Sequence, residues 1–278
     1  MICCAHETAW PVLAVLPTLQ RGTPSGIFTK GVFTALSRNS PEDLIRLTAA
    51  IRALEKQRGA GPAFTGWQNA PLNVLDCVLS LNRRYEKFCL PRVKRFAANR
   101  SNIQQLADLR GLIMGYPTPL AFSELELDYR DERRAGVVLG VTEYLLRVLH
   151  AFPATIGGLS GPDSEMARLG AWARSVTPND AWSTGVRGFA LAGFQYLRML
   201  FGVQTAKPDV HIRRFVSEKV GRKISDAESL ALLEAVAIQE NLPLADLDYL
   251  IWLKRSGAAH QSTRVPRSAH GGGHKTSV

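Results

Sequence analysis

The sequence predicts an all-α protein, and three observations carry this prediction. Apolar residues recur at helical spacing, as they do at Val74, Leu75, Val78, Leu79 and Leu81. Helix-starting patterns occur along the whole chain, whereas the apolar and polar alternation typical of strands is almost absent. With 278 residues, of which 46% are hydrophobic and 21% charged, the chain has a globular composition and can build a sizeable core.

The first half of the chain contains a series of predicted helices. Ser40 is a suitable N-cap, Pro41 suits a first turn, and Glu42 and Asp43 favour the positive end of the helix dipole. This helix is expected to end at the glycines of 59–61. A second helix is expected over 71–90, with Pro91 breaking it. Further helices are expected near 92–98, 103–113, 124–127, 131–151 and 163–175.

The second half carries clearer boundaries. Thr177 and Pro178 begin a short helix that the turn Gly185–Gly188 interrupts, and the chain then continues as a helix to Phe201. Pro208 precedes a helix expected over 210–220. The capping-box pattern of residues 225–228 predicts a helix that runs to about residue 240. The last helix is expected over 244–254.

The two ends of the chain differ from its middle. Residues 1–40 carry few periodic signals and are expected to form an irregular N-terminal extension. Residues 256–278 contain Gly, Ser, His and basic residues but no acid, which predicts a disordered basic tail. There is no basic leader typical of a signal peptide and no run of 18 apolar residues. We therefore expect a cytoplasmic protein with no membrane contact.

The cysteine pattern gives no sign of a metal site. The four cysteines lie at positions 3, 4, 77 and 89, and no two of them form a C-x-x-C pair. A zinc ribbon or a thioredoxin-type site is therefore not expected, and reduced thiols are the simplest interpretation. We expect neither a metal nor a cofactor.

The basic excess is concentrated in two ordered stretches. The formal net charge is +10. Residues 82–100 hold seven bases and one acid, residues 207–223 hold six bases and two acids, and residues 226–248 hold six acids and no base. A single charged run is usually a solvated helix face. Two such runs in one chain favour a surface that binds the phosphates of nucleic acid.

Two motifs lie close to these basic stretches. Gly185-Val186-Arg187-Gly188 places a glycine turn at the N-terminus of a helix, where backbone N–H groups can approach a phosphate. About twenty residues later comes Lys207-Pro-Asp-Val-His211, which is followed by Arg213 and Arg214. Asp209 comes directly before a predicted helix, so an N-cap role is the structural alternative to a chemical one.

Together these motifs resemble the helix-hairpin-helix DNA glycosylases of the endonuclease III superfamily. Gly185 and Gly188 match the hairpin glycines with one extra residue between them. Ala192 matches the small residue of the next helix, and Phe201-Gly202 matches the turn after that helix. Asp209 matches the family's aspartate, and His211 and Arg214 match the residues that follow it. Upstream, residues 74–82 are similar to the family's early helix, and Asn82 stands where a polar side chain fills the gap left by a flipped base.

This resemblance covers roughly residues 70–255 and implies a fold and an activity. It implies a helical domain over 41–255 with one lobe at about 70–195 and a second formed by 41–69 and 196–255. It also implies a monofunctional, nucleoid-associated and monomeric glycosylase that acts on duplex DNA containing a damaged or mismatched base, with Asp209 as the catalytic residue. The DNA-contacting residues would be Asn82, Arg83, Arg84, Gly185, Val186, Arg187, Gly188, Lys207, His211, Arg213 and Arg214.

Departures from the family pattern set limits on this expectation. Ala190 stands where bifunctional members carry a lysine, so no Schiff-base lyase step is expected from that position. No cysteine follows Cys89, so the iron–sulfur cluster that some members carry after the last helix is not expected here. Candidates for stacking on a base are Tyr85, Trp182, Phe189 and Trp252.

Two other functions stay open at this stage. The first is a noncatalytic DNA-binding protein that uses the same fold. The second is an all-α interaction protein whose basic face meets an acidic protein or RNA.

Overall fold

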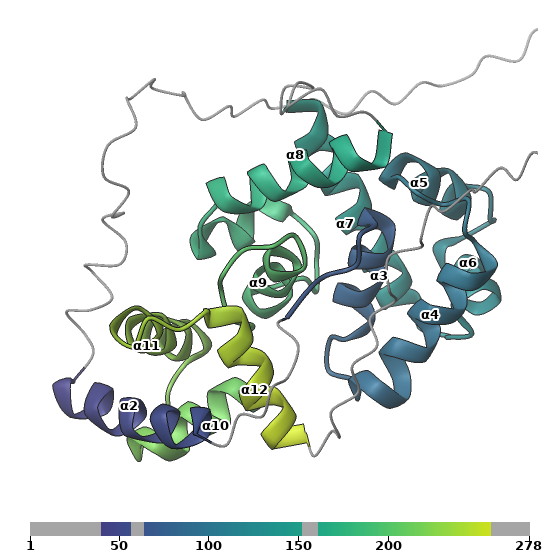
Figure 1. Ribbon diagram of the computed structural model, residues 1–278. Coiled ribbons are helices and arrows are strands. Elements are labelled where there is room, and N and C mark those ends of the chain that lie inside the picture. Colours follow the sequence, from purple (N-terminus) through teal and green to yellow (C-terminus); the bar gives the residue numbers. More distant parts are fainter. Residues whose placement is uncertain (1–39, 57–63, 152–160, 257–278) are drawn as a thin grey trace, which may run out of the picture.

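The computed structural model describes residues 40–56, 64–151 and 161–256, and all regular structure in these ranges is helical (Figure 1). The prediction of an all-α fold is therefore confirmed. The N-terminal extension expected over 1–40 and the tail expected over 256–278 lie outside the described residues except for Ser40, which caps α2, and Ser256, which ends α12. None of the described helices has the length and apolar character needed to cross a membrane.

The described residues form the following helical elements. In chain order they are α2 (Pro41–Glu55), α3 (Ala70–Leu79), the π-helical turn η1 (Tyr85–Cys89), α4 (Leu90–Asn99), α5 (Leu106–Met114), α6 (Pro119–Leu127), α7 (Glu132–Ala151), α8 (Gly161–Ser175), the 3₁₀ helix η2 (Pro178–Thr184), α9 (Leu191–Leu200), α10 (Val210–Val220), α11 (Asp226–Gln239) and α12 (Leu244–Ser256).

Several helices begin where the capping signals predict. The hydroxyl of Ser40 accepts the N–H of Glu42 at 3.3 Å at the start of α2. The hydroxyl of Ser225 accepts the N–H of Glu228 at 3.2 Å at the start of α11. Such caps satisfy N–H groups that have no partner inside the helix.

The single helix expected over 71–90 is wrong, because the chain forms two helices there. α3 ends at Leu79, and a loop leads through η1 into α4. Asn82 lies in the left-handed region with φ +54°, which asparagine tolerates better than most residues, and it turns the chain between the two helices. Pro91 lies in the first turn of α4, where its missing N–H costs no hydrogen bond.

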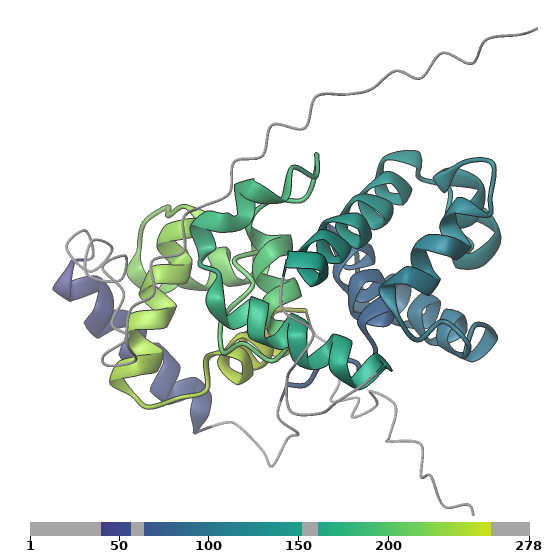
Figure 2. The same cartoon turned by 90° about the horizontal axis from the view of Figure 1, so that it is seen from above.

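The core consists of two buried clusters. The first is centred on α3, α7 and α9 and also takes in side chains of α4, α5, α6 and α8. The second joins α2 to α10, α11 and α12. Figure 2 shows these two groups of helices side by side. Although α2 is far from α10–α12 in sequence, ion pairs of 2.7 Å between Asp43 and Arg222 and 2.6 Å between Arg52 and Glu240 help to hold it there.

Residues 64–67 connect the two clusters. The N–H of Phe64 donates to Oδ1 of Asp246 in α12 at 2.7 Å. Two residues later, Gly66 lies against α9 so closely that a Cβ atom would stand 2.0 Å from the carbonyl oxygen of Leu200. Trp67 then enters the first cluster. The junction between the clusters is therefore tightly packed, and the candidate site is built around it.

Candidate nucleic-acid interface

The glycine turn lies between η2 and α9. Gly185 has φ +67° and Gly188 has φ +91°, so both occupy a region that glycine adopts without strain. The N–H of Phe189 donates to the carbonyl of Val186 at 3.1 Å and closes the turn. Ala190, the N-cap of α9, offers no side-chain acceptor to the first N–H groups of that helix. These groups are therefore suited to an anion.

Asp209 lies at the N-terminus of α10 and caps it. Its Oδ1 accepts the N–H of His211 at 2.8 Å and that of Ile212 at 3.2 Å, and the residue is half-buried. The N-cap role considered from sequence is therefore real. The cap fixes one carboxylate oxygen and the orientation of the side chain.

A second aspartate, Asp248 of α12, lies near Asp209. Its Oδ1 accepts the N–H of Lys207 at 2.8 Å. Burial raises the pKa of Asp248 well above its ordinary value, and the negative charge of Asp209 raises it further. The environment thus favours the neutral form of Asp248, which reduces the repulsion between the two acids.

Lys207 turns toward the junction between the two clusters. Its Nζ donates to Oγ of Ser80 at 3.1 Å and lies 4.3 Å from the centre of the Tyr196 ring, a cation–π contact. Sequence reasoning assigned Lys207 to DNA contact, and the structure gives its ammonium group an internal partner instead. The segment before Asp209 is thereby attached to the C-terminal end of α3.

A buried carboxylate organises that end of α3. Asp76 is fully buried. Its Oδ2 accepts Nε1–H of Trp67 at 2.6 Å and the hydroxyl of Tyr85 at 2.8 Å, and its Oδ1 accepts the hydroxyl of Tyr196 at 2.9 Å. Three aromatic donors from separate segments thus hold α3 in place. In the same region, burial raises the pKa of the Cys77 thiol.

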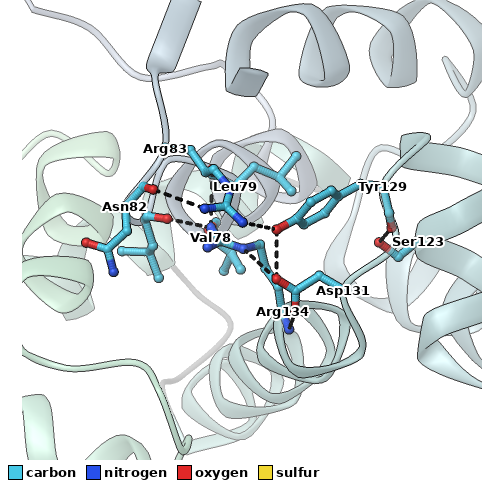
Figure 3. A network of polar contacts seen from close by, with 9 residues as sticks. Val78, Leu79, Asn82, Arg83, Ser123, Tyr129, Asp131 and Arg134 are labelled. Carbon is cyan, nitrogen blue, oxygen red and sulfur yellow. Dashed lines mark hydrogen bonds and ion pairs between the residues drawn. The ribbon is translucent and has the colours of Figure 1, made fainter. Parts of the chain in front are cut away.

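Arg134 of α7 fixes the loop that follows α3 (Figure 3). Its Nη1 donates to the carbonyl oxygens of Val78 at 2.9 Å and Leu81 at 2.6 Å. A guanidinium group at a helix C-terminus satisfies orphan carbonyls and complements the helix dipole. Asp131 holds the start of α7 by accepting the N–H of Arg134 at 2.9 Å.

Asn82, Arg83 and Arg84 are all exposed on this loop. The guanidinium group of Arg83 donates to the hydroxyl of Tyr129 at 3.0 Å and lies 5.6 Å from the centre of the Phe88 ring. Figure 3 shows the side-chain amide of Asn82 pointing away from this network. The side chain of Arg84 has no hydrogen-bond or ion-pair partner within the described part of the chain.

The other predicted contact residues divide into two groups. Arg213 is paired with Asp226 at 2.6 Å, and the backbone of His211 is used by the Asp209 cap. Arg187 and Arg214 are exposed, and neither has a partner among residues 40–56, 64–151 and 161–256. Arg84, Arg187 and Arg214 are therefore the predicted arginines best placed to bind phosphate.

The aromatic candidates for stacking also differ in exposure. Phe189 is buried in the first cluster, and Tyr85 packs edge-on against Trp252 with ring centres 5.7 Å apart. Trp182 of η2 is 79% exposed, three residues before Gly185. A tryptophan in this position offers an open face to a base.

Residues that sequence reasoning missed include Asp76, Ser80, Arg134 and Asp248. Their roles arise from contacts between distant segments, and no local pattern marks them. Within the described ranges, no three His, Cys, Asp or Glu side chains are grouped so as to hold a metal ion.

One family model matches the chain, a domain of unknown function (DUF8548), over residues 173–256. This range includes the Gly185–Gly188 turn, Lys207, Asp209 and Asp248, but it is less than half of the chain. Its description assigns no activity. No curated protein and no solved structure matches the chain.

Proposed function

We propose that this protein is a monofunctional DNA glycosylase, which extrudes a damaged or mismatched base from duplex DNA and hydrolyses its N-glycosidic bond. The base must leave the stack because the bond is unreachable inside the duplex. Asp209 stabilises the oxocarbenium-like sugar or activates the attacking water. The turn Gly185–Gly188 and the loop of Asn82, Arg83 and Arg84 hold the DNA.

The observation that carries the proposal is the hydrogen bond of 3.1 Å between Lys207 and Ser80. Asp209 is two residues after Lys207, and Asn82 is two residues after Ser80. The contact therefore brings the proposed catalytic residue and the proposed gap-filling residue to the same junction, although they are far apart in sequence. A shared location of these two residues supports a function in which base extrusion is followed by attack at the sugar.

The test is base release from a panel of oligonucleotide duplexes. The panel carries uracil, 8-oxoguanine, alkylated purines, hypoxanthine and mismatches, and hot alkali then cuts each abasic site. Wild type should release at least one base, and Asp209→Asn should lower the rate about 10²-fold or more while DNA binding stays intact. Asparagine caps helices about as well as aspartate, so the fold of α10 should survive the change.

A matched control is available in α8. Asp163 is an exposed acid in the first turn of that helix, so Asp163→Asn removes the same charge from a comparable position outside the proposed site. It should release the base at the wild-type rate. Equal loss of activity in both variants would contradict the assignment of Asp209.

A second candidate is a noncatalytic DNA-binding protein on the same fold. It is favoured by the use of Asp209 as a helix cap, which gives this residue a structural role without any chemistry. This function predicts tight, salt-dependent duplex binding with no base release. Equal binding of wild type and Asp209→Asn, together with no released base from any duplex, would support it.

A further inference from the structure

An open groove lies between α7 and the glycine turn. It encloses about 700 Å³. Its lining residues come from positions 132–147 of α7 and from residues 184–187. Asp209 is not among them, so this groove is separate from the proposed catalytic residue.

Three arginines dominate the charge of the groove. Arg133, Arg147 and Arg187 are exposed, and none has an ion-pair partner in the described part of the chain. Of the two acids, Glu143 is already paired with Arg110 at 3.4 Å. The groove thus presents more free positive than free negative charge, which favours an anionic ligand.

The arginines of α7 lie along one stripe of the helix. Arg133 and Arg147 are fourteen residues apart, with Gly140 midway between them, so all three share a face of α7. At about 1.5 Å per residue, the two guanidinium groups are carried by positions roughly 21 Å apart. A DNA strand carries one phosphate per about 3.4 Å of helix axis, so this stripe spans roughly six phosphates.

Glycines let a backbone approach between the arginines. Gly136 has open space where a Cβ atom would stand, and Gly140 lies against Val186, whose Cγ1 would be 3.0 Å from such an atom. At the rim, a Cβ atom on Gly188 would stand 3.4 Å from Nε and Nη2 of Arg133. The glycine turn and the guanidinium group of Arg133 therefore lie against each other and form one surface.

The shape of the groove favours an extended polyanion over a small ligand. Small-molecule sites are mostly apolar and bury most of their ligand. Here Glu132, Arg133, Gly136, Arg147 and Arg187 are all exposed, and the wall is largely charged or glycine. Such an open basic channel matches a sugar–phosphate backbone, whose contacts are made mainly by arginine and lysine side chains and by backbone N–H groups.

We propose that the duplex interface continues from the glycine turn into this groove, where Arg133 and Arg147 of α7 bind the phosphate backbone beside Arg187. The proposal rests on the duplex binding included in the proposed function, but not on its catalytic step. It extends the interface from the glycine turn along α7.

The test measures the salt dependence of binding to a fluorescent undamaged duplex of about 25 base pairs by anisotropy. The variant is Arg133→Gln/Arg147→Gln in the full chain. The logarithm of the association constant falls as the logarithm of the salt concentration rises. Loss of two phosphate contacts should make this slope less steep by about 1.8 and weaken binding roughly 10- to 60-fold at about 0.1 M salt. Arg147→Gln alone should reduce the slope by about 0.9.

A matched control removes two charges from another surface. Lys56 and Lys223 are exposed bases outside the groove with no ion-pair partner in the described part of the chain, so Lys56→Gln/Lys223→Gln changes the net charge equally without touching the groove. This variant should keep nearly the wild-type slope. Thermal unfolding of every variant checks that the fold is retained.

Each outcome decides the proposal. A wild-type slope and affinity in the folded groove variant would overturn it, even if base release by wild type upholds the glycosylase. A reduced slope without base release from any lesion would uphold the groove and contradict the glycosylase. Unchanged duplex binding combined with lost binding to a polyglutamate peptide would overturn it in favour of an acidic protein partner.

Discussion

The change Asp76→Asn tests how much the buried Asp76 side chain stabilises the junction between the two clusters. In the native protein a fully buried carboxylate accepts hydrogen bonds from Trp67, Tyr85 and Tyr196, and a longer one of 3.9 Å from the Cys89 thiol. A hydrogen bond to a charged group contributes about 1.5–3 kcal/mol, against about 0.5–1.5 kcal/mol for a neutral one. Asparagine has one acceptor oxygen and places an N–H₂ group against the remaining donors. It also avoids the cost of burying a charge, which offsets part of the loss.

The net expectation is a loss of about 2–4 kcal/mol in the free energy of unfolding, a large share of the 5–15 kcal/mol typical of a domain. Urea unfolding followed by circular dichroism measures it, with the denaturant slope unchanged. Tyr85→Phe removes a single donor and should cost about 1 kcal/mol. The exposed Asp163→Asn should stay within about 0.5 kcal/mol of wild type. A change below about 0.5 kcal/mol in Asp76→Asn would refute the inference that this carboxylate organises the junction.

Three further predictions test the scaffold and the interface. Burial raises the pKa of Glu165 to about 7, so its protonated form contributes stability that is present below about pH 4.5 and is lost as the pH rises through 7. Glu165→Gln should therefore flatten the decline of the melting temperature between pH 5 and pH 8. An unaltered pH profile of the melting temperature would contradict the burial argument. Arg134→Met leaves the C-terminal carbonyls of α3 without their donor and should lower the unfolding free energy by about 1–3 kcal/mol. Backbone hydrogen exchange should become faster in residues 78–84. Unchanged protection there would show that this cap is dispensable. Trp182→Ala should leave the melting temperature near that of wild type, because the side chain is 79% exposed. The variant should bind a duplex with an unpaired base about 1–3 kcal/mol more weakly. Equal affinity of both proteins would show that Trp182 does not contact the DNA.

Local signals in the sequence predicted much of the fold. The caps at Ser40, Ser225 and Asp209 depend on a side chain and the N–H groups two or three residues later, so the sequence alone is enough to place them. The α3–α4 boundary was missed because its apolar spacing continues through the loop. The turn there depends on the left-handed backbone of Asn82 and on the distant Arg134, and neither contributes to helical periodicity.

The site depends more strongly on contacts between distant segments. The motif makes Asp209 a candidate, but the inward turn of Lys207 follows from Ser80 and Tyr196, which no local pattern connects to it. The groove on α7 was missed for a different reason. Its arginines are interleaved with Glu132 and Glu143, so a count of charge along the chain shows no basic run, although three-dimensional pairing leaves the arginines free.

The most direct measurement is the single-turnover rate of base release by wild type and Asp209→Asn across the lesion panel, with protein in excess over duplex. The glycosylase proposal predicts release of at least one lesion by wild type, a loss of about 10²-fold or more in Asp209→Asn, and equal duplex affinity of the two proteins. Release at the same rate by both proteins, or no release by wild type while it saturates every duplex, would contradict it.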